Sequence, residues 1–353
     1  MKKIAIIGAG IFGSTVAIHA ARTGKYEVHL YDKLNNLLQA ASGINQYRLH
    51  RGYHYPRSSE TAFSILKAEE SFREEYGDSI IETGRHLYAI AKHDSFVTGE
   101  QFLNFCDEHG LPYKKVLVDE LVNPDMVEFV IEADEARFDQ NILRELVKVK
   151  LEKSGVSIHL GVKAKDIPSD SFDKVIIAAY AGMNEASEAF GLPKHEYQYE
   201  VCEKPVVMLP DAFKQTDIVI MDGPFMCVDP RGTSGEYVMG NVVHALHAVN
   251  TGLTPVIPEE LAPLLNHGVV VNPPITRFDK FIESGIPFIP LLSEAKHIGS
   301  MYTVRTVLPR LEKTDARPTV VTNIDGHFIQ IFSGKVSNCV LAARDALHIL
   351  EKE

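Results

Sequence analysis

The hydrophobic and polar positions of this 353-residue chain follow two patterns. Short apolar, β-branched runs that end at glycine or a polar residue are typical of buried parallel strands. They predict strands at 3–7, 27–31, 156–161 and 173–179. Apolar residues that recur on one face predict helices at 14–22, 138–153 and 336–350. The first strand, helix and second strand form a βαβ unit, which implies a right-handed crossover in a parallel sheet.

A different pattern fills the middle of the chain. Short β-rich runs between 197 and 240 predict an antiparallel sheet, and 84–91 predicts another strand. A helix is predicted to begin at Ser58 or Ser59, either of which can cap it. The proline-rich stretch 253–290 predicts little regular structure.

The antiparallel signals separate the parallel ones, so the sequence predicts an α/β fold with two discontinuous domains. We expect a Rossmann-like domain built from residues 1–80, 138–195 and 300–353. A second, α+β domain with an antiparallel sheet would take residues 81–137 and 196–299.

The turn after the first strand carries Gly8, Gly10 and Gly13, spaced as in a dinucleotide-binding motif. In such a turn the first glycine permits the tight bend, the second admits a pyrophosphate and the third lets helix and strand pack closely. Asp32 ends the second strand, near the spacing at which an acid binds a ribose hydroxyl. An acid there disfavours a 2′-phosphate, and therefore NADP. The motif alone leaves NAD and FAD open.

An aromatic and basic segment follows Asp32, where an NAD-dependent dehydrogenase would continue with further βα units. Residues 48–57, RLHRGYHYPR, hold three arginines, two histidines and two tyrosines. This local positive field suits an anionic substrate.

Several segments resemble the FAD-dependent oxidoreductases of the D-amino-acid oxidase family, which includes glycine, sarcosine and L-2-hydroxyglutarate oxidases. They are GAGIFGSTVAIHAA with Asp32, ASGINQYRLHRGYHYPRS, DKVIIAAYAG, RTVLPRLEKTDARPT and FSGKVSNCVLAARDA. The chain departs from the family at residues 179–182, where Ala-Thr-Gly is usual, and in the glycine-rich stretch replaced by 332–338. The resemblance implies FAD and transfers no particular substrate.

The resemblance also implies which residues contact each part of FAD. For the pyrophosphate and ribose they are Gly8, Ala9, Gly10, Ile11, Phe12, Gly13, Asp32 and Lys33. For the phosphates and the flavin ring they are Ser42, Gly43, Asn45 and Gln46. Near the adenine we expect Ala164, and at the flavin pyrimidine end Gly334, Lys335, Val336 and Ser337. Ala179, after the strand at 173–179, is a further expected cofactor contact.

Candidate catalytic residues are His50, Lys335 and Arg305. His50 is expected to act as a base or to hydrogen-bond the flavin, and Lys335 to assist oxygen reduction or bind a substrate carboxylate. Arg305 and, more weakly, Arg310 lie where the family places substrate-side groups. The expected substrate-binding residues are Arg48, Tyr53, Tyr55 and Arg57. Each also has a structural interpretation, as part of a solvated loop, helix start or strand end.

Together these features predict an oxidoreductase that oxidises a small anionic amino acid, secondary amine or 2-hydroxy acid by hydride transfer to flavin N5. The electron acceptor would be oxygen or an unknown compound. An NAD-dependent dehydrogenase and a non-catalytic flavin-binding module remain alternatives.

Composition narrows the partners further. A formal net charge of −11 argues against nucleic acid as a partner. The cysteines and histidines lack metal-ligand spacing, so no metal is expected. No apolar run is long enough to span a bilayer, and the first residues do not read as a signal peptide, so a cytoplasmic location is expected.

Overall fold

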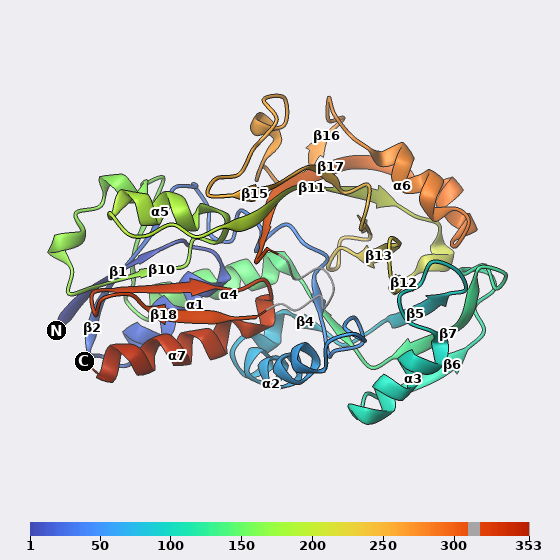
Figure 1. Ribbon diagram of the computed structural model, residues 1–353, viewed down its shortest axis with the longest axis horizontal. Coiled ribbons are helices and arrows are strands. Elements are labelled where there is room, and N and C mark those ends of the chain that lie inside the picture. Colours follow the sequence, from blue (N-terminus) through green and yellow to red (C-terminus); the bar gives the residue numbers. More distant parts are fainter. Residues whose placement is uncertain (310–317, 353) are drawn as a thin grey trace.

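The computed structural model describes residues 1–309 and 318–352, so Arg310 lies outside the described residues. A six-stranded sheet forms one end of the molecule, where both chain ends lie (Figure 1). Its order is β18-β19-β10-β1-β2-β9, with only β18 antiparallel to its neighbour. The strands are β1 (Lys2–Ile7), β2 (Tyr26–Asp32), β9 (Ser157–Leu160), β10 (Lys174–Ile177), β18 (Val320–Asn323) and β19 (Phe328–Phe332).

Helices cover both faces of this sheet. One face packs against α1 (Ile11–Arg22), α4 (Gln140–Lys153) and α7 (Cys339–Lys352), with α2 (Ser59–Tyr76) beside α7. The opposite face packs against α5 (Met183–Ala189). The alternation of β1 explains this division, since Ile4 and Ile6 face the first layer while Ala5 and Ile7 face the second. The structure confirms the predicted α/β class.

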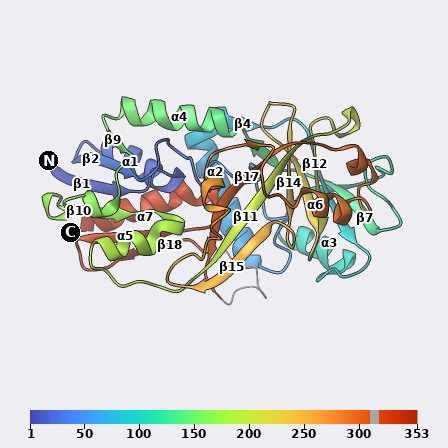
Figure 2. The same cartoon turned by 90° about the horizontal axis from the view of Figure 1, so that it is seen from above.

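A ten-stranded sheet forms the other end of the molecule (Figures 1 and 2). Its order is β16-β17-β11-β14-β13-β12-β5-β7-β6, with β15 also on β11, and only β12 and β5 pair in parallel. The strands are β5 (Arg85–Ala91), β6 (Tyr113–Val116), β7 (Val127–Ala133), β11 (Tyr197–Met208), β12 (Thr216–Met221), β13 (Met226–Pro230), β14 (Tyr237–Asn241), β15 (Leu246–Gly252), β16 (Val270–Val271) and β17 (Lys296–Val307). Helices α3 (Gly99–Glu108) and α6 (Phe278–Gly285) pack beside it.

A small sheet, β3-β8-β4, and several 3-10 turns connect these parts. Its strands are β3 (Arg48–Leu49), β4 (Ile80–Ile81) and β8 (Ala136–Phe138). The 3-10 turns are η1 (Gly77–Ser79), η2 (Ala164–Asp166), η3 (Ser169–Ser171), η4 (Tyr180–Gly182), η5 (Asp211–Phe213), η6 (Ala262–Leu264), η7 (Pro290–Glu294) and η8 (Val336–Asn338). The large sheet contributes Val206, Val238 and Met301 to the core that lies under α1. The two large sheets therefore meet through packed side chains, while the exact domain boundaries stay a prediction.

Two local predictions can be compared with the structure. Ser58 caps α2, as predicted, because its hydroxyl accepts a hydrogen bond from the Thr61 N–H at 3.3 Å. The prediction of little regular structure at 253–290 is wrong in part, because α6 forms there and buries Phe281. The apolar face of α6 is too short to produce a helical period that can be recognised in the sequence.

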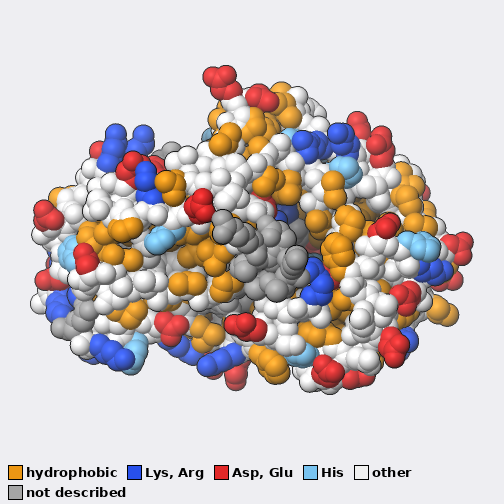
Figure 3. Space-filling view, in the orientation of Figure 1, with side chains coloured by type: hydrophobic (Ala, Val, Ile, Leu, Met, Phe, Trp, Pro, Cys, Tyr) orange, Lys and Arg blue, Asp and Glu red, His pale blue; other side chains and the backbone are white. Residues whose placement is uncertain are grey.

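On the face in Figure 3, acidic and basic side chains are interspersed. Among the helices of the described residues, none has both the length and the apolar character needed to cross a membrane. The described residues also contain no group of three or more metal-ligating side chains.

Candidate functional site

The glycine turn between β1 and α1 is shaped to admit a dinucleotide. Gly8 has φ +110°, and a Cβ there would lie 2.5 Å from the carbonyl oxygen of Ala178. A Cβ on Gly13 would overlap the carbonyl oxygen of Gly8, so the helix packs directly on the strand end. Gly10 is different, since a Cβ there would meet only the Ser42 hydroxyl at 3.1 Å. Its missing side chain leaves space beside the positive end of α1, which suits a pyrophosphate.

Asp32 organises this turn from the end of β2. Its carboxylate accepts hydrogen bonds from the N–H groups of Ala9 at 2.7 Å and Leu34 at 2.8 Å. Burial raises the pKa of Asp32, although these two N–H groups act in the opposite direction. Each carboxylate oxygen retains acceptor capacity for a ribose hydroxyl. The residues present therefore fit the dinucleotide half of FAD.

The segment that follows folds back onto the start of α1. The Ser42 hydroxyl accepts the Ile11 N–H at 3.0 Å, so it satisfies one N–H at the start of α1, where the N-cap Gly10 has no side chain to do so. Asn45 stabilises its own turn, donating to the Ala41 carbonyl and accepting the Tyr47 N–H. Gly43 packs against the Leu38 carbonyl, which leaves no room for a side chain. Gln46 extends away from this turn, its Nε2 3.9 Å from the Cys227 sulfur on β13.

Three further predicted cofactor residues, Ala164, Ala179 and Lys33, lie near the ends of the parallel strands. Ala164 begins η2, and Ala179 lies against Gly8 at the end of β10. Lys33 is turned outward, where its ammonium pairs with Glu185 of α5. Ala179 thus lies at the glycine turn as a cofactor contact would, whereas the Lys33 amine is engaged in an ion pair with Glu185.

The C-terminal candidates precede η8 and α7. Gly334 is exposed, Lys335 and Val336 are partly buried, and Ser337 is buried. The Ser333 hydroxyl accepts the Lys335 N–H at 3.3 Å and holds this turn. The Asn338 Oδ1 atom is buried without a partner, although its Nδ2 donates to Thr319 at 2.7 Å.

His50, His54, Tyr55 and Lys335 form one group, here called the histidine cluster. The His50 and His54 rings lie 5.1 Å apart, and both lie edge-on to the Tyr55 ring at 5.9 and 5.4 Å. The Lys335 ammonium sits over the same tyrosine, 4.1 Å from its centroid. Residues from two segments that are distant in the sequence therefore meet here. The sequence analysis named these residues singly and did not predict that they lie together.

Burial shifts the titration of this cluster toward neutral forms. Burial lowers the pKa of His50, although the negative charge of Glu135 acts to raise it. Burial also lowers the pKa of His54 well below its usual value. It also lowers the pKa of Lys335 to about 7. No described carboxylate pairs with the Lys335 ammonium. A buried cation without a counter-ion is costly and is stabilised by an anionic ligand.

We therefore expect Lys335→Met to stabilise the FAD-saturated protein at low pH. Folded Lys335 releases its proton near pH 7, whereas an unfolded lysine holds it to about pH 10.4. The unfolded state binds more protons between these values, so wild-type stability rises with pH there. The advantage of the variant should be largest below pH 7 and shrink toward pH 10. Denaturant unfolding of both proteins across this range measures the difference, and parallel curves would contradict the expectation.

Three predicted substrate-binding residues and the catalytic candidate Arg305 have protein partners in the structure. The Tyr53 hydroxyl donates to the Pro112 carbonyl, and Arg57 donates to Asp222 at 2.6 Å. Arg305 donates to Glu200 on the neighbouring strand. Arg48 is buried among carboxylates. Tyr55 alone of the predicted substrate residues lies in the histidine cluster.

Arg48 belongs to a buried charge cluster behind the histidines. Its guanidinium donates to Asp229 and lies 3.6 Å from Glu135 and 3.8 Å from Asp217. Arg137 lies 3.3 Å from Asp217, and all these side chains are almost fully buried. Burial raises the pKa of Asp229, which Arg48 opposes. Arg48 thus compensates buried carboxylates instead of facing a ligand.

Sequence reasoning missed Lys204 on β11. It lies opposite Met301 of β17, and the Met301 sulfur is 3.6 Å from the Tyr47 hydroxyl. Lys204 therefore points from the sheet toward the segment that holds Ser42 and Gln46. Burial lowers its pKa, and no described carboxylate forms a salt bridge with it. In the sequence Lys204 is only a polar residue within an apolar run, and this pattern does not indicate a site residue.

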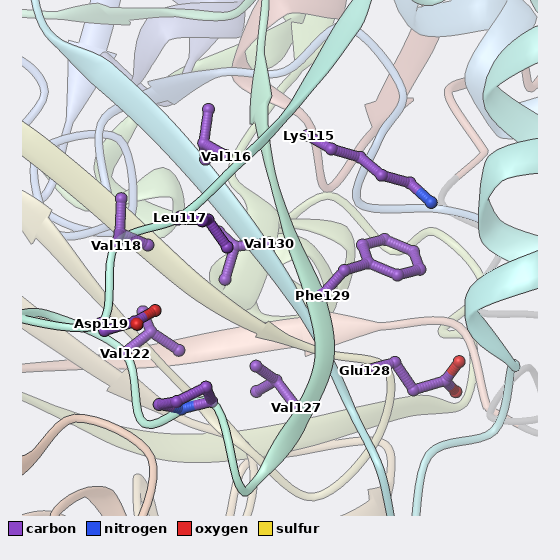
Figure 4. Close-up of a pocket in the computed structure, with 11 residues that line it drawn as sticks. Lys115, Val116, Leu117, Val118, Asp119, Val122, Val127, Glu128, Phe129 and Val130 are labelled. Atoms are coloured by element: carbon purple, nitrogen blue, oxygen red, sulfur yellow. The ribbon is translucent and has the colours of Figure 1, made fainter.

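A separate apolar pocket lies at the edge of the large sheet (Figure 4). Its lining comes from β6, β7 and the turn between them, and includes Val116, Val118, Val127 and Phe129. It contains neither a histidine nor an arginine among its lining residues. The candidate site is therefore the region of the histidine cluster and the glycine turn.

Comparison with known proteins gives matches over most or nearly all of the chain. The family model described as DAO, FAD dependent oxidoreductase, matches residues 3–279. The FAD-dependent monooxygenase kojA of Aspergillus flavus is 27% identical, covering 99% of this chain and 85% of its own length. The FAD-dependent monooxygenase FPY4 of Fusarium mangiferae is 22% identical, covering 99% and 91%.

Solved structures share the fold. Glycine oxidase from Geobacillus kaustophilus has a TM-score of 0.71 at 14% identity, covering 100% of this chain and 96% of its own. FAD-bound L-α-glycerophosphate oxidase from Mycoplasma pneumoniae has a TM-score of 0.74 at 14% identity, covering 99% and 95%. At these identities the likeness concerns the fold alone.

Proposed function

The chain belongs to the DAO family of FAD-dependent oxidoreductases, and we propose that it oxidises a small anionic amino acid, secondary amine or 2-hydroxy acid. FAD is its cofactor, and this excludes the alternative of an NAD-dependent dehydrogenase. The family also makes it an enzyme in place of a non-catalytic flavin-binding module. Bound FAD supplies a two-electron acceptor, reached by hydride transfer to N5 in this proposal.

One observation carries the proposal, namely the amine of Lys335 beside two histidines without a described carboxylate partner. Lys335 lies over Tyr55 within the histidine cluster and forms no ion pair with a described carboxylate. Lys204, opposite Met301 on the large sheet, likewise forms no salt bridge with a described carboxylate. An anionic group on the substrate would compensate this charge. The substrate class follows from charge, while the choice between C–N and C–O chemistry depends on His50.

His50 has the properties of a base for a 2-hydroxy acid. Burial lowers its pKa, so the ring is neutral near pH 7. In this proposal the substrate O–H proton moves to His50 while the C–H bond breaks and its electron pair leaves as hydride. The product is then a 2-oxo acid. An amine needs less help, because its neutral form already carries the lone pair that forms the C=N bond.

The remaining assignments are part of the same proposal. Tyr55 would close one side of the substrate space, with Tyr53, Arg48 and Arg57 supporting the loop that carries it. Arg305 would reach the substrate only on release from Glu200. Oxygen is the proposed electron acceptor and the cytoplasm the proposed location.

The test is the visible spectrum of the purified protein followed by anaerobic titration. The panel contains D- and L-amino acids, N-methyl amines and 2-hydroxy acids. We expect flavin absorbance, and its bleaching by one anionic class. Bleaching by no member of the panel would overturn the substrate proposal. The monooxygenase names of the curated relatives suggest a different outcome, in which oxygen is consumed only when a separate reductant reduces the flavin first.

His50→Asn is expected to slow anaerobic flavin reduction by about 100-fold if the substrate is a 2-hydroxy acid, because general-base catalysis typically contributes this much or more. With an amine substrate at alkaline pH the effect should be much smaller. Stopped-flow absorbance at the flavin band measures the rate. His93→Asn is the matched control, since His93 is exposed and lies outside the site. Equal rates for wild type and His50→Asn with a 2-hydroxy acid would exclude His50 as the base.

A further inference from the structure

Glu135 lies beside His50, just beyond the paired residues of the small sheet. Strands β3 and β8 pair Arg48 with Arg137 and Leu49 with Ala136, and continuing this register by one residue sets His50 opposite Glu135. Cross-strand neighbours of this kind have adjacent side chains. The His50 Nδ1 atom is 3.6 Å from the Glu135 carboxylate, an ion-pair distance slightly longer than a hydrogen bond.

The Glu135 carboxylate is fixed from several sides. The Tyr88 hydroxyl donates to one oxygen at 2.7 Å, and the Arg51 N–H donates to the other at 3.0 Å. The side chain is fully buried. Burial would raise the pKa of Glu135, but His50 and Arg48 outweigh this and hold the pKa well below its usual range. A charged carboxylate therefore faces the histidine ring in a set orientation.

The two nitrogens of His50 have different surroundings. The Nδ1 atom, which faces the Glu135 carboxylate at 3.6 Å, is buried and makes no hydrogen bond in the structure, whereas Nε2 is not among the buried unpaired atoms. A carboxylate at Nδ1 selects the tautomer that carries its proton there, and this leaves the Nε2 lone pair free.

We propose that Glu135 is a positioning residue, which orients His50 through Nδ1 so that Nε2 can accept the substrate proton. This rests on the base role proposed for His50. Glu135 acts through the histidine and does not itself touch the reacting atoms.

The other charged groups around His50 make the effect of Glu135 visible. Arg48 on β3 and Lys335 before η8 both disfavour the protonated ring, and the His54 and Tyr55 rings pack against it. Glu135 is the acidic group that opposes them. Removing its charge should leave the cations unopposed and weaken proton binding by His50.

The first test uses wild-type holoenzyme, so it does not depend on the folding of a variant. Ring ¹⁵N shifts of His50, assigned by comparison with His50→Asn, report the tautomer above its titration range. We expect the proton on Nδ1. A neutral ring protonated on Nε2 would overturn the proposal, whatever the turnover of the enzyme.

The second test compares Glu135→Gln with Asp217→Asn in the holoenzyme. Both substitutions remove one buried carboxylate charge near Arg48, but only Glu135 faces His50. The His50 titration midpoint should fall by about 1 to 3 pH units in Glu135→Gln, the usual effect of an opposite charge at this distance. It should move much less in Asp217→Asn. An unchanged midpoint in Glu135→Gln, or equal shifts in both, would show that Glu135 only supports Arg48.

These readouts separate this inference from the proposed function. If His50→Asn retains full flavin reduction with a 2-hydroxy acid, the base role fails even when the tautomer is as expected. If turnover depends on His50 but the tautomer and midpoint do not depend on Glu135, the positioning role fails alone.

Discussion

Gly8→Ala should lose FAD and be destabilised by about 3 kcal/mol or more. A residue with φ near +110° is strained by about 1–3 kcal/mol when it is not glycine, and overpacking against fixed backbone adds about as much. Here the new Cβ would press on the Ala178 carbonyl at 2.5 Å and on the Ala179 Cα at 3.1 Å. Neither atom can move without separating β1 from β10. Urea unfolding and the flavin content after gel filtration measure the two effects.

Two glycine variants serve as controls for Gly8→Ala. Gly24→Ala also has a positive φ of +69°, but a Cβ there meets nothing within 4 Å, so it isolates backbone strain of about 1 kcal/mol. Gly10→Ala should keep the fold, since a Cβ meets only the flexible Ser42 hydroxyl, yet bind FAD about tenfold or more weakly. Normal flavin content in Gly10→Ala would mean that the pyrophosphate does not pass beside this residue.

Replacing Arg48 by leucine is expected to cost about 3–5 kcal/mol of stability, because it leaves buried carboxylates without their cation. Asp229, Asp217 and Glu135 all depend on this guanidinium. Denaturant unfolding measures the loss. Arg85→Leu is the matched control, since its pair with Glu132 is partly exposed and should cost about 1 kcal/mol or less.

A double variant tests the cause of the Arg48 effect. Adding Asp229→Asn to Arg48→Leu removes one of the stranded charges, so the pair should be less destabilised than the sum of the single variants. Strict additivity would mean that Arg48 stabilises the protein through packing of its stem and not through charge. It would also leave the role of the buried charge cluster without support.

The sequence predicted the parts of this protein whose signals are local. The βαβ unit, the Gly8-Gly10-Gly13 turn and Asp32 lie within about thirty residues, and each has a strong physical reason for its spacing. The fold class and FAD followed from them together with the family resemblance. Asp32 could be placed at the turn because the end of a parallel strand has few alternatives.

The partners of the predicted site residues could not be read in the same way. Nothing near Arg48 announces Asp229 or Asp217, which come from β13 and β12 of the other sheet. In the sequence Glu135 is one of several acidic residues in its segment. Only the folded structure shows that its carboxylate lies beside His50. Lys204 becomes a site residue only because the long pairing of β11 with β17 turns it toward Tyr47. Such contacts depend on tertiary register, which composition and periodicity do not encode.

The strand order of the six-stranded sheet has a consequence for synthesis of the chain. β1 lies between β2 and β10, and β10 in turn needs β19 as its neighbour, while α7 covers α1. The glycine turn is therefore made first but supported last, after more than 300 further residues have left the ribosome. Contacts of such long sequence separation form slowly. We therefore expect the turn to bind FAD only after β19 and α7 have been synthesised, and unfolded intermediates of the chain to be prone to aggregation until then.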